Sequence, residues 1–182
     1  MKLEEAVLQL ASERDITTAS VSELTRRAGV VRTTFYAHAD TPVNLLTSVL
    51  SRELDDARDL LLFELAKGVE KGQFRDLTRR SLTKVVDHVL RYEAVYGGAS
   101  SASSAYALRT VLGGHIADSV FRALEAGYFD APSRKPEELT LYAAYMATGA
   151  AGAIEVWLRL SKPRSREMLL TAIDDVLPSW YV

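Results

Sequence analysis

The sequence predicts an all-α fold with about nine helices, three short ones near the N-terminus followed by a bundle of longer ones. Apolar residues recur at the 3.6-residue spacing of amphipathic helices along most of the chain. The ten Gly and five Pro residues mostly fall between these periodic segments. The alternation of apolar and polar residues that is typical of strands is hard to find.

The composition is that of an ordinary globular protein. The chain has 182 residues, of which 48% are hydrophobic and 25% are charged, which is enough to bury a sizeable core. It has no cysteine, which excludes disulfides, thiolate catalysis and cysteine-ligated zinc and favours a cytoplasmic location. The net charge of −2 gives no global sign of nucleic-acid binding, so such binding must depend on a local site.

Neither the first residues nor the longest apolar stretch predicts a membrane protein. The first residues lack the basic and apolar regions of a signal peptide. The apolar stretch Leu139–Leu160 contains Glu155 and Arg159 and has no paired basic flanks. It is better interpreted as a buried helix than as a membrane span.

The N-terminal elements follow from their start and stop signals. Ser20 and Glu23 have the spacing of a capping box, and Gly29 supplies a tight exit after the helix that they open. Thr41 and Pro42 suit the start of a long helix, because proline at the first helical position loses no hydrogen bond. The predicted helices here are about Leu3–Arg14, Val21–Ala28, Arg32–His38 and Thr41–Lys67.

The C-terminal part continues the helical periodicity. After Gly72 the pattern restarts and is interrupted by a predicted loop at Gly97–Ser101 and by a break at Asp130–Pro136. The predicted helical segments are about Phe74–Val89, Leu108–Leu124, Glu137–Leu160 and Ser165–Trp180.

Two short helices joined by a glycine-containing turn predict a helix-turn-helix within Val21–His38. In that motif the second helix presents its N-terminal side chains to base edges in the major groove. Arginines suit phosphate contacts, whereas hydroxyls suit hydrogen bonds to bases and contact with a thymine methyl. We expect Phe35 in the core and His38 at a phosphate. The candidate DNA-binding residues are Arg26, Arg27, Arg32, Thr33, Thr34, Tyr36 and His38.

The sequence Ala28-Gly29-Val30, followed by Thr34-Phe35-Tyr36 and His38, resembles the DNA-binding signature of the TetR family. The resemblance covers roughly residues 3 to 50. It implies a transcriptional repressor that binds a palindromic operator in double-stranded DNA as a homodimer and is released by a small-molecule effector. It also implies a helix-turn-helix domain over residues 1–47 and a ligand-binding and dimerisation domain over residues 48–182. The alternative is a DNA-binding dimer that needs no ligand.

The chain departs from this family pattern at several positions. Val31 replaces the usual Ser or Thr, so the second helix of the motif lacks a side-chain N-cap, at a cost of about 1 kcal/mol. Pro42 replaces a lysine that commonly contacts phosphate, and such a loss weakens binding without changing the sequence that is read. Ala39 and Ala11 replace aromatic residues. These changes concern DNA affinity more than the fold.

The bundle holds candidates for a small-molecule site. Such sites are mostly apolar with a few polar groups, and a lone histidine on an apolar stripe fits that description, although an ordinary core role is the alternative for each candidate. His88 and His115, with acids nearby, lack metal-ligand spacing, so we expect no metal and no cofactor. The candidate ligand-binding residues are Tyr92, Tyr96, His115, Tyr142, Tyr145, Met146 and Trp157.

A run of small residues from Ala143 to Ala153 predicts close approach by another helix. Glycine inside a helix costs about 1 kcal/mol relative to alanine, so Gly149 and Gly152 need a packing reason. A homodimer seam formed by the helices at about 137–160 and 165–180 supplies that reason. No arrangement typical of catalysis is present, and we expect no enzyme.

Overall fold

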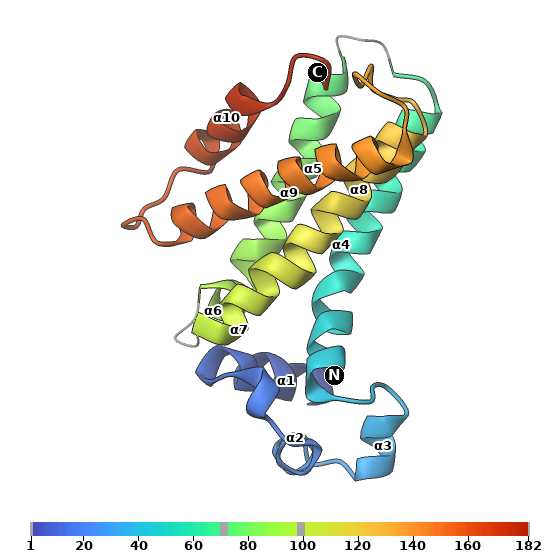
Figure 1. Ribbon diagram of the computed structural model, residues 1–182. Coiled ribbons are helices and arrows are strands. Elements are labelled where there is room, and N and C mark those ends of the chain that lie inside the picture. Colours follow the sequence, from blue (N-terminus) through green and yellow to red (C-terminus); the bar gives the residue numbers. More distant parts are fainter. Residues whose placement is uncertain (1, 70–72, 98–100, 182) are drawn as a thin grey trace. The chain divides into compact units, whose positions relative to one another are not determined.

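The computed structural model describes residues 2–69, 73–97 and 101–181, and these residues form helices and connecting turns without strands (Figure 1). The predicted all-α class is therefore confirmed. The helices are α1 (Lys2–Glu13), α2 (Val21–Ala28), α3 (Arg32–Tyr36), α4 (Pro42–Ala66), α5 (Phe74–Arg91), α6 (Glu93–Tyr96), α7 (Ser101–Tyr106), α8 (Gly113–Glu125), α9 (Pro136–Leu158) and α10 (Arg166–Val176).

Two shorter elements complete the helical structure. A 3₁₀ turn covers Ile16–Thr18, and a π-helical segment over Ala107–Leu112 joins α7 to α8. The short helices α6 and α7 were not predicted as separate elements. Of the loop predicted at Gly97–Ser101, residues 98–100 lie outside the described residues, and Ser101 begins α7. No helix in the described ranges is long and apolar enough to cross a membrane.

The chain divides into two compact units, one comprising residues 1–52 and 92–111, the other residues 53–91 and 112–182. The packing therefore adds residues 92–111 to the N-terminal unit. The assignment of separate functions to residues 1–47 and 48–182 stays a prediction.

The first unit is built around the apolar face of α1. Leu10 on α1, Leu24 on α2 and Phe35 on α3 are each completely buried. Ser103 on α7 ties the later segment to this core: its Oγ accepts a hydrogen bond from the Ile16 N–H at 2.9 Å and donates one to the Arg14 carbonyl at 2.8 Å. This buried serine is one of the contacts that join α7 to the N-terminal residues of the same unit.

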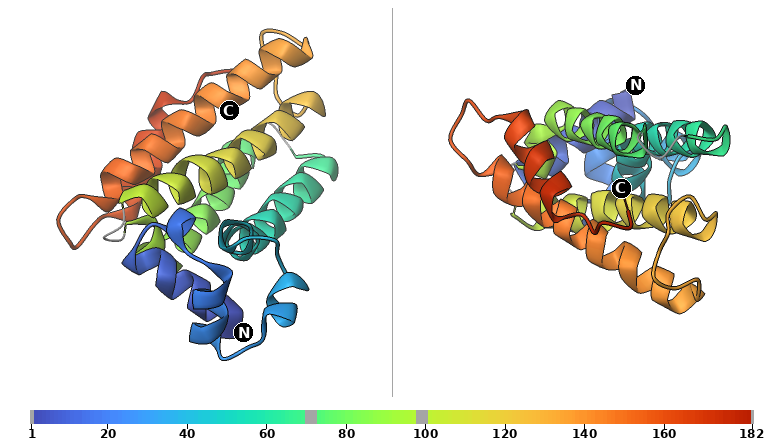
Figure 2. Two further views of the ribbon diagram at one scale, coloured as in Figure 1. Left: turned by 60° about the horizontal axis from the view of Figure 1, so that its bottom comes forward. Right: turned by 90° about the horizontal axis from the view of Figure 1, so that it is seen from above.

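The second unit is a bundle in which α9 lies along α8, with α10 against α5 and α9 (Figure 2). Its apolar core includes Leu65 on α4, Leu124 on α8 and Leu139 on α9. The segment after α10 returns to this core, where the Tyr181 ring stacks on the Phe129 ring with centroids 4.2 Å apart.

Helix starts follow the predicted caps. The Ser20 hydroxyl accepts from the Glu23 N–H at 3.2 Å, and the Thr41 hydroxyl accepts from the Asn44 N–H at 3.1 Å. The second half of the predicted capping box is wrong, because the Glu23 carboxylate forms an ion pair with Arg14 instead of reaching back to its own cap. The ion pair between Arg14 and Glu23 thus takes the place of the predicted contact between Glu23 and Ser20.

Two predicted helix ends are too late. The helix predicted to reach His38 ends at Tyr36, where the His38 N–H turns to the Phe35 carbonyl at 2.9 Å. The helix predicted to reach Trp180 ends at Val176, and Leu177 is extended, with ψ 140°. Pro178 accounts for this end, because a residue that precedes proline is driven out of the helical region.

Candidate DNA-binding surface and ligand cavity

The α2–turn–α3 segment is a helix-turn-helix whose two helices are held by buried side chains. Gly29 ends α2 with φ 63°, a left-handed conformation that glycine adopts without steric cost. Leu24 and Phe35 are completely buried and Ala28 nearly so. The apolar residues thus fix α3 against α2 and leave the opposite face of α3 to solvent.

All the side chains predicted to contact DNA lie on the surface of the first unit. The same short helix buries Phe35 and exposes 57% of its neighbour Tyr36, with the two rings edge to face at 5.4 Å between centroids. The exposed predicted residues are Arg26, Arg27, Arg32, Thr33, Thr34, Tyr36 and His38.

The three arginines differ in their surroundings. The Arg27 guanidinium pairs with the Glu13 carboxylate at 2.7 Å, and this hydrogen bond lowers the pKa of Glu13. Arg32 donates to the Ser22 hydroxyl. Arg26 has no ion pair or hydrogen bond from its side chain to any other described residue. Of the three arginines, Arg26 is therefore the one that could contact a phosphate without breaking an existing contact.

The N-terminus of α3 has the predicted weak cap. Val31 occupies the N-cap position with no side-chain hydrogen bond and is 66% exposed. The helix is therefore held by Phe35 and by its backbone turns rather than by a cap, in keeping with its length of five residues.

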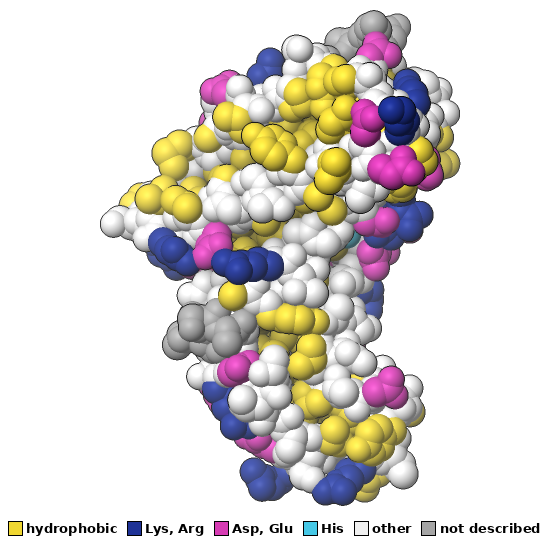
Figure 3. Space-filling model, in the orientation of Figure 1, with side chains coloured by type: hydrophobic (Ala, Val, Ile, Leu, Met, Phe, Trp, Pro, Cys, Tyr) yellow, Lys and Arg dark blue, Asp and Glu magenta, His cyan; other side chains and the backbone are white. Residues whose placement is uncertain are grey.

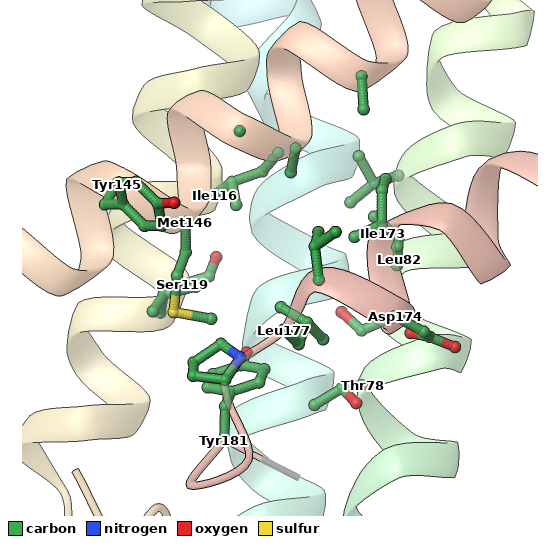
Figure 4. A pocket seen from close by; sticks show the side chains of 18 of the residues that line it. Thr78, Leu82, Ile116, Ser119, Tyr145, Met146, Ile173, Asp174, Leu177 and Tyr181 are labelled. Carbon is green, nitrogen blue, oxygen red and sulfur yellow. The ribbon is translucent and has the colours of Figure 1, made fainter. Parts of the chain in front are cut away.

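The second unit contains a cavity of about 230 Å³, seen from close by in Figure 4. Its walls come from α4, α5, α8, α9, α10 and the segment after α10, and they are mostly apolar with a few polar side chains. The lining residues are Leu61, Thr78, Ser81, Leu82, Val85, His115, Ile116, Ser119, Val120, Tyr145, Met146, Gly149, Ala150, Ala153, Ala172, Ile173, Asp174, Val176, Leu177, Pro178 and Tyr181.

The structure brings three of the predicted ligand-binding residues together and leaves four elsewhere. His115, Tyr145 and Met146 line the cavity. Tyr92 and Tyr96 belong to the first unit, where Tyr96 is almost fully buried as core.

The other two predicted residues lie in the second unit but outside the cavity wall. The Trp157 indole N–H donates to the Ser165 carbonyl at 3.0 Å, and Arg164 lies over its ring. The Tyr142 hydroxyl reaches Glu138, and its ring packs against Trp180. Both aromatic residues are thus used to fix neighbouring segments.

Several polar residues of the cavity were missed. Ser119 follows His115 by one helical turn and its spacing was visible in the sequence. Tyr181 was not predictable, because it follows a segment that was expected to be helical up to Trp180, whereas the helix ends at Val176. Asp174 lines the wall but is ion-paired with Arg79, whose pKa this carboxylate raises.

His115 is a buried polar group beside a charged cluster. Its Nδ1 has no hydrogen-bond partner among the described residues and lies 3.7 Å from the Asp55 carboxylate, and its Nε2 lies 3.4 Å from the Ser119 hydroxyl. Burial lowers the pKa of His115 to about 4, with a further lowering from Arg58 that Asp55 and Asp118 oppose. The imidazole is therefore neutral at pH 7. Across the described parts of the chain, no group of three or more acidic, histidine or cysteine side chains is arranged to hold a metal.

The buried His115 predicts a loss of stability in mild acid. The unfolded chain binds a proton near the ordinary pKa of 6.5, whereas the folded chain does so only near 4, so stability falls as the pH drops between these values. The decrease should be about 2 kcal/mol between pH 7 and pH 5. Urea unfolding at both pH values measures it, with His38→Asn as the control at an exposed histidine. A pH dependence that is the same in His115→Asn and wild type would contradict this assignment.

Comparison with known proteins gives structural neighbours only. No family model matches the chain, and no curated protein matches it. The fatty acid degradation regulator FadR from Bacillus halodurans superposes with a TM-score of 0.62 at 11% identity, covering 96% of this chain and 95% of that one. RolR without ligand superposes with a TM-score of 0.55 at 19% identity, covering 96% and 88%.

RolR in complex with the ligand resorcinol gives a TM-score of 0.55 at 18% identity, covering 97% of this chain and 85% of that chain. At these identities the likeness shows the fold. This chain thus has an all-helical fold that is similar, over nearly its whole length, to the folds of RolR and FadR in solved structures.

Proposed function

We propose that this chain is a TetR-like transcriptional repressor, which binds a palindromic operator as a homodimer and is released by a small-molecule effector in the cavity of its second unit. The observation that carries the proposal is the α2–α3 motif, in which Phe35 is buried and Arg26, Thr33 and Tyr36 are exposed on the surface. The structural neighbour FadR is itself a regulator by name.

The cavity favours the effector-dependent version over a dimer that needs no ligand. A bundle that served only dimerisation would have no use for a continuous, mostly apolar space, whereas small-molecule sites are of this kind. The RolR neighbour holds resorcinol. An effector shifts DNA affinity only as far as it prefers one conformation of the protein, so binding in the cavity must differ between the DNA-bound and released states.

One helix is suited to carry the signal. Leu61 of α4 lines the cavity, while Leu46 and Leu50 of the same helix are fully buried in the core of the first unit. A continuous helix transmits a displacement as a rigid element. We propose that α4 relays effector binding to the spacing of the two α3 helices in the dimer.

The proposed dimer uses exposed apolar side chains on α9 and α10. Leu141, Tyr145 and Val156 follow the spacing of one face of α9, and each is at least 60% exposed. Met168 on α10 is 50% exposed. Hydrophobic side chains also gather on the face shown in Figure 3, over the part that α9 and α10 occupy in Figure 1. Contiguous exposed apolar surface of this kind is typical of an interface.

The glycines of α9 add support for a second copy at this face. A Cβ atom on Gly149 or Gly152 would meet nothing within 4 Å. Packing within the described part of the chain therefore does not require glycine at either position. Close approach of a symmetry-related helix would require it.

DNA binding is the direct test. We expect saturable, salt-sensitive binding to a near-palindrome in the DNA that flanks the coding region of this protein. Arg26→Ala should weaken it and reduce the slope of log affinity against log salt by about 1, because one phosphate contact is lost. Arg80→Ala removes another exposed arginine, which lies on α5, and should change neither quantity. Equal binding by the wild type and Arg26→Ala, no tighter than to random DNA, would refute the proposal for that site.

A further inference from the structure

Tyr181 is a largely buried tyrosine at one end of the cavity. The residue is 8% exposed, and its side chain rises toward Leu177 in Figure 4. Its ring is fixed by stacking on Phe129 and by the edge of Trp180, with centroids 6.2 Å apart in the second contact. The phenol oxygen forms no hydrogen bond with any other described residue. Because Tyr181 lines the cavity, this hydroxyl is available to a bound molecule.

The hydroxyl acts as a donor over the whole physiological range. Burial raises the pKa of Tyr181 well above its ordinary value, so the phenol keeps its proton. An oxygen atom of a ligand that accepts a hydrogen bond from this hydroxyl would give it a partner that the described residues do not provide.

The charges around the cavity disfavour an ionic ligand. No lysine or arginine is among the residues that line it, so a carboxylate would find no cation. Asp174 is the acid in the wall, and its carboxylate is already paired with Arg79. The neighbouring His115 is neutral at pH 7. An ion of either sign would thus lose its hydration without gaining an unpaired opposite charge.

We propose that the cavity binds an uncharged, mostly apolar molecule whose hydroxyl or carbonyl oxygen accepts a hydrogen bond from Tyr181. The inference rests on the proposed effector site and adds the chemical class of its ligand and the residue that selects it. A water molecule occupies about 30 Å³ in the liquid. The 230 Å³ available therefore suits a molecule with one ring and a short chain.

A set of probes with one carbon skeleton tests the charge. Calorimetric titration of the full chain at pH 7 would compare 3-phenyl-1-propanol with 3-phenylpropanoate and 3-phenylpropylamine. We expect the neutral alcohol to bind at least tenfold more tightly than either ion. Tighter binding of the carboxylate or the amine, or no detectable binding of the alcohol up to its solubility, would overturn the proposal.

The hydrogen bond is tested by Tyr181→Phe, which keeps the stacked ring and removes the hydroxyl. The variant should weaken binding of 3-phenyl-1-propanol about tenfold and leave binding of propylbenzene, which has no oxygen, unchanged. Tyr142→Phe removes a hydroxyl that lies outside the cavity wall and should affect neither probe. Equal weakening of both probes by Tyr181→Phe, or of neither, would overturn the assigned role.

DNA release separates this inference from the proposed function. Alcohol binding that depends on Tyr181, with no effect on DNA affinity, supports the ligand class and contradicts regulation by this site. Failure of the alcohol to bind, with operator binding intact, overturns the ligand class and leaves the DNA-binding proposal supported.

Discussion

Replacing Phe35 with alanine should lower the free energy of unfolding by about 3–5 kcal/mol and abolish DNA binding. Phe35 is completely buried, and no side-chain cap supports the five-residue helix that carries it. Truncation removes the transfer free energy of the ring and leaves a cavity beneath α3, so the helix loses the contact that positions it. Urea unfolding followed by circular dichroism, together with a DNA-binding titration, measures both effects.

The adjacent Tyr36 provides the matched comparison. Because Tyr36 is 57% exposed, Tyr36→Ala should change the free energy of unfolding by about 0.5 kcal/mol or less. It should nevertheless weaken operator binding about tenfold or more, as expected for loss of a base or phosphate contact. Tyr36→Phe shows whether the hydroxyl or the ring makes that contact. A Tyr36→Ala chain that binds the operator as tightly as wild type would remove Tyr36 from the DNA-reading surface.

Introducing arginine at both Leu141 and Val156 should convert the proposed dimer to a monomer. These residues are 67% and 60% exposed in the single chain, so the substitutions should leave the fold intact. In a two-fold interface each of the two substitutions occurs twice. The double variant would therefore bury four unpaired charges, which is strongly unfavourable. Sedimentation velocity at a concentration where wild type is dimeric measures the change.

A matched control lies on another helix of the same unit. Phe63 on α4 is an apolar residue with 59% exposure, so Phe63→Arg should leave the dimer intact. Loss of the dimer should also weaken binding to a two-half-site operator, since the two reading helices are no longer linked. A monomeric wild type, or a variant that remains dimeric, would contradict the assignment of α9 and α10 to the interface.

In the helix-turn-helix, local sequence signals determine most of the candidate site. Ser20, Gly29 and the spacing of Leu24 and Phe35 define where α2 begins and ends and which side of each helix is buried. The exposed positions then follow from helical geometry alone. The predicted surface arginines and Tyr36 therefore lie where the sequence placed them, although their contacts with DNA remain predictions.

The limits of local reasoning appear where a residue has two competing partners. Glu23 has the spacing to complete a capping box, but in the folded chain Arg14 offers it an ion pair. Arg27 looks like a free surface cation, yet Glu13 lies 2.7 Å away. Such choices depend on which side chains the packing of α1 brings near α2, and periodicity contains no information about that.

The sequence by itself determined the all-α class, most helix boundaries and the exposed face of α3, because capping, proline geometry and helical periodicity act over a few residues. Only the tertiary structure decided that residues 92–111 join the N-terminal unit and that Tyr92 and Tyr96 are not among the residues that line the cavity. It alone brought Tyr181 to the cavity wall beside α5, α8 and α9. A cavity forms where distant helices fail to fill the space between them, so its lining depends on their packing in three dimensions.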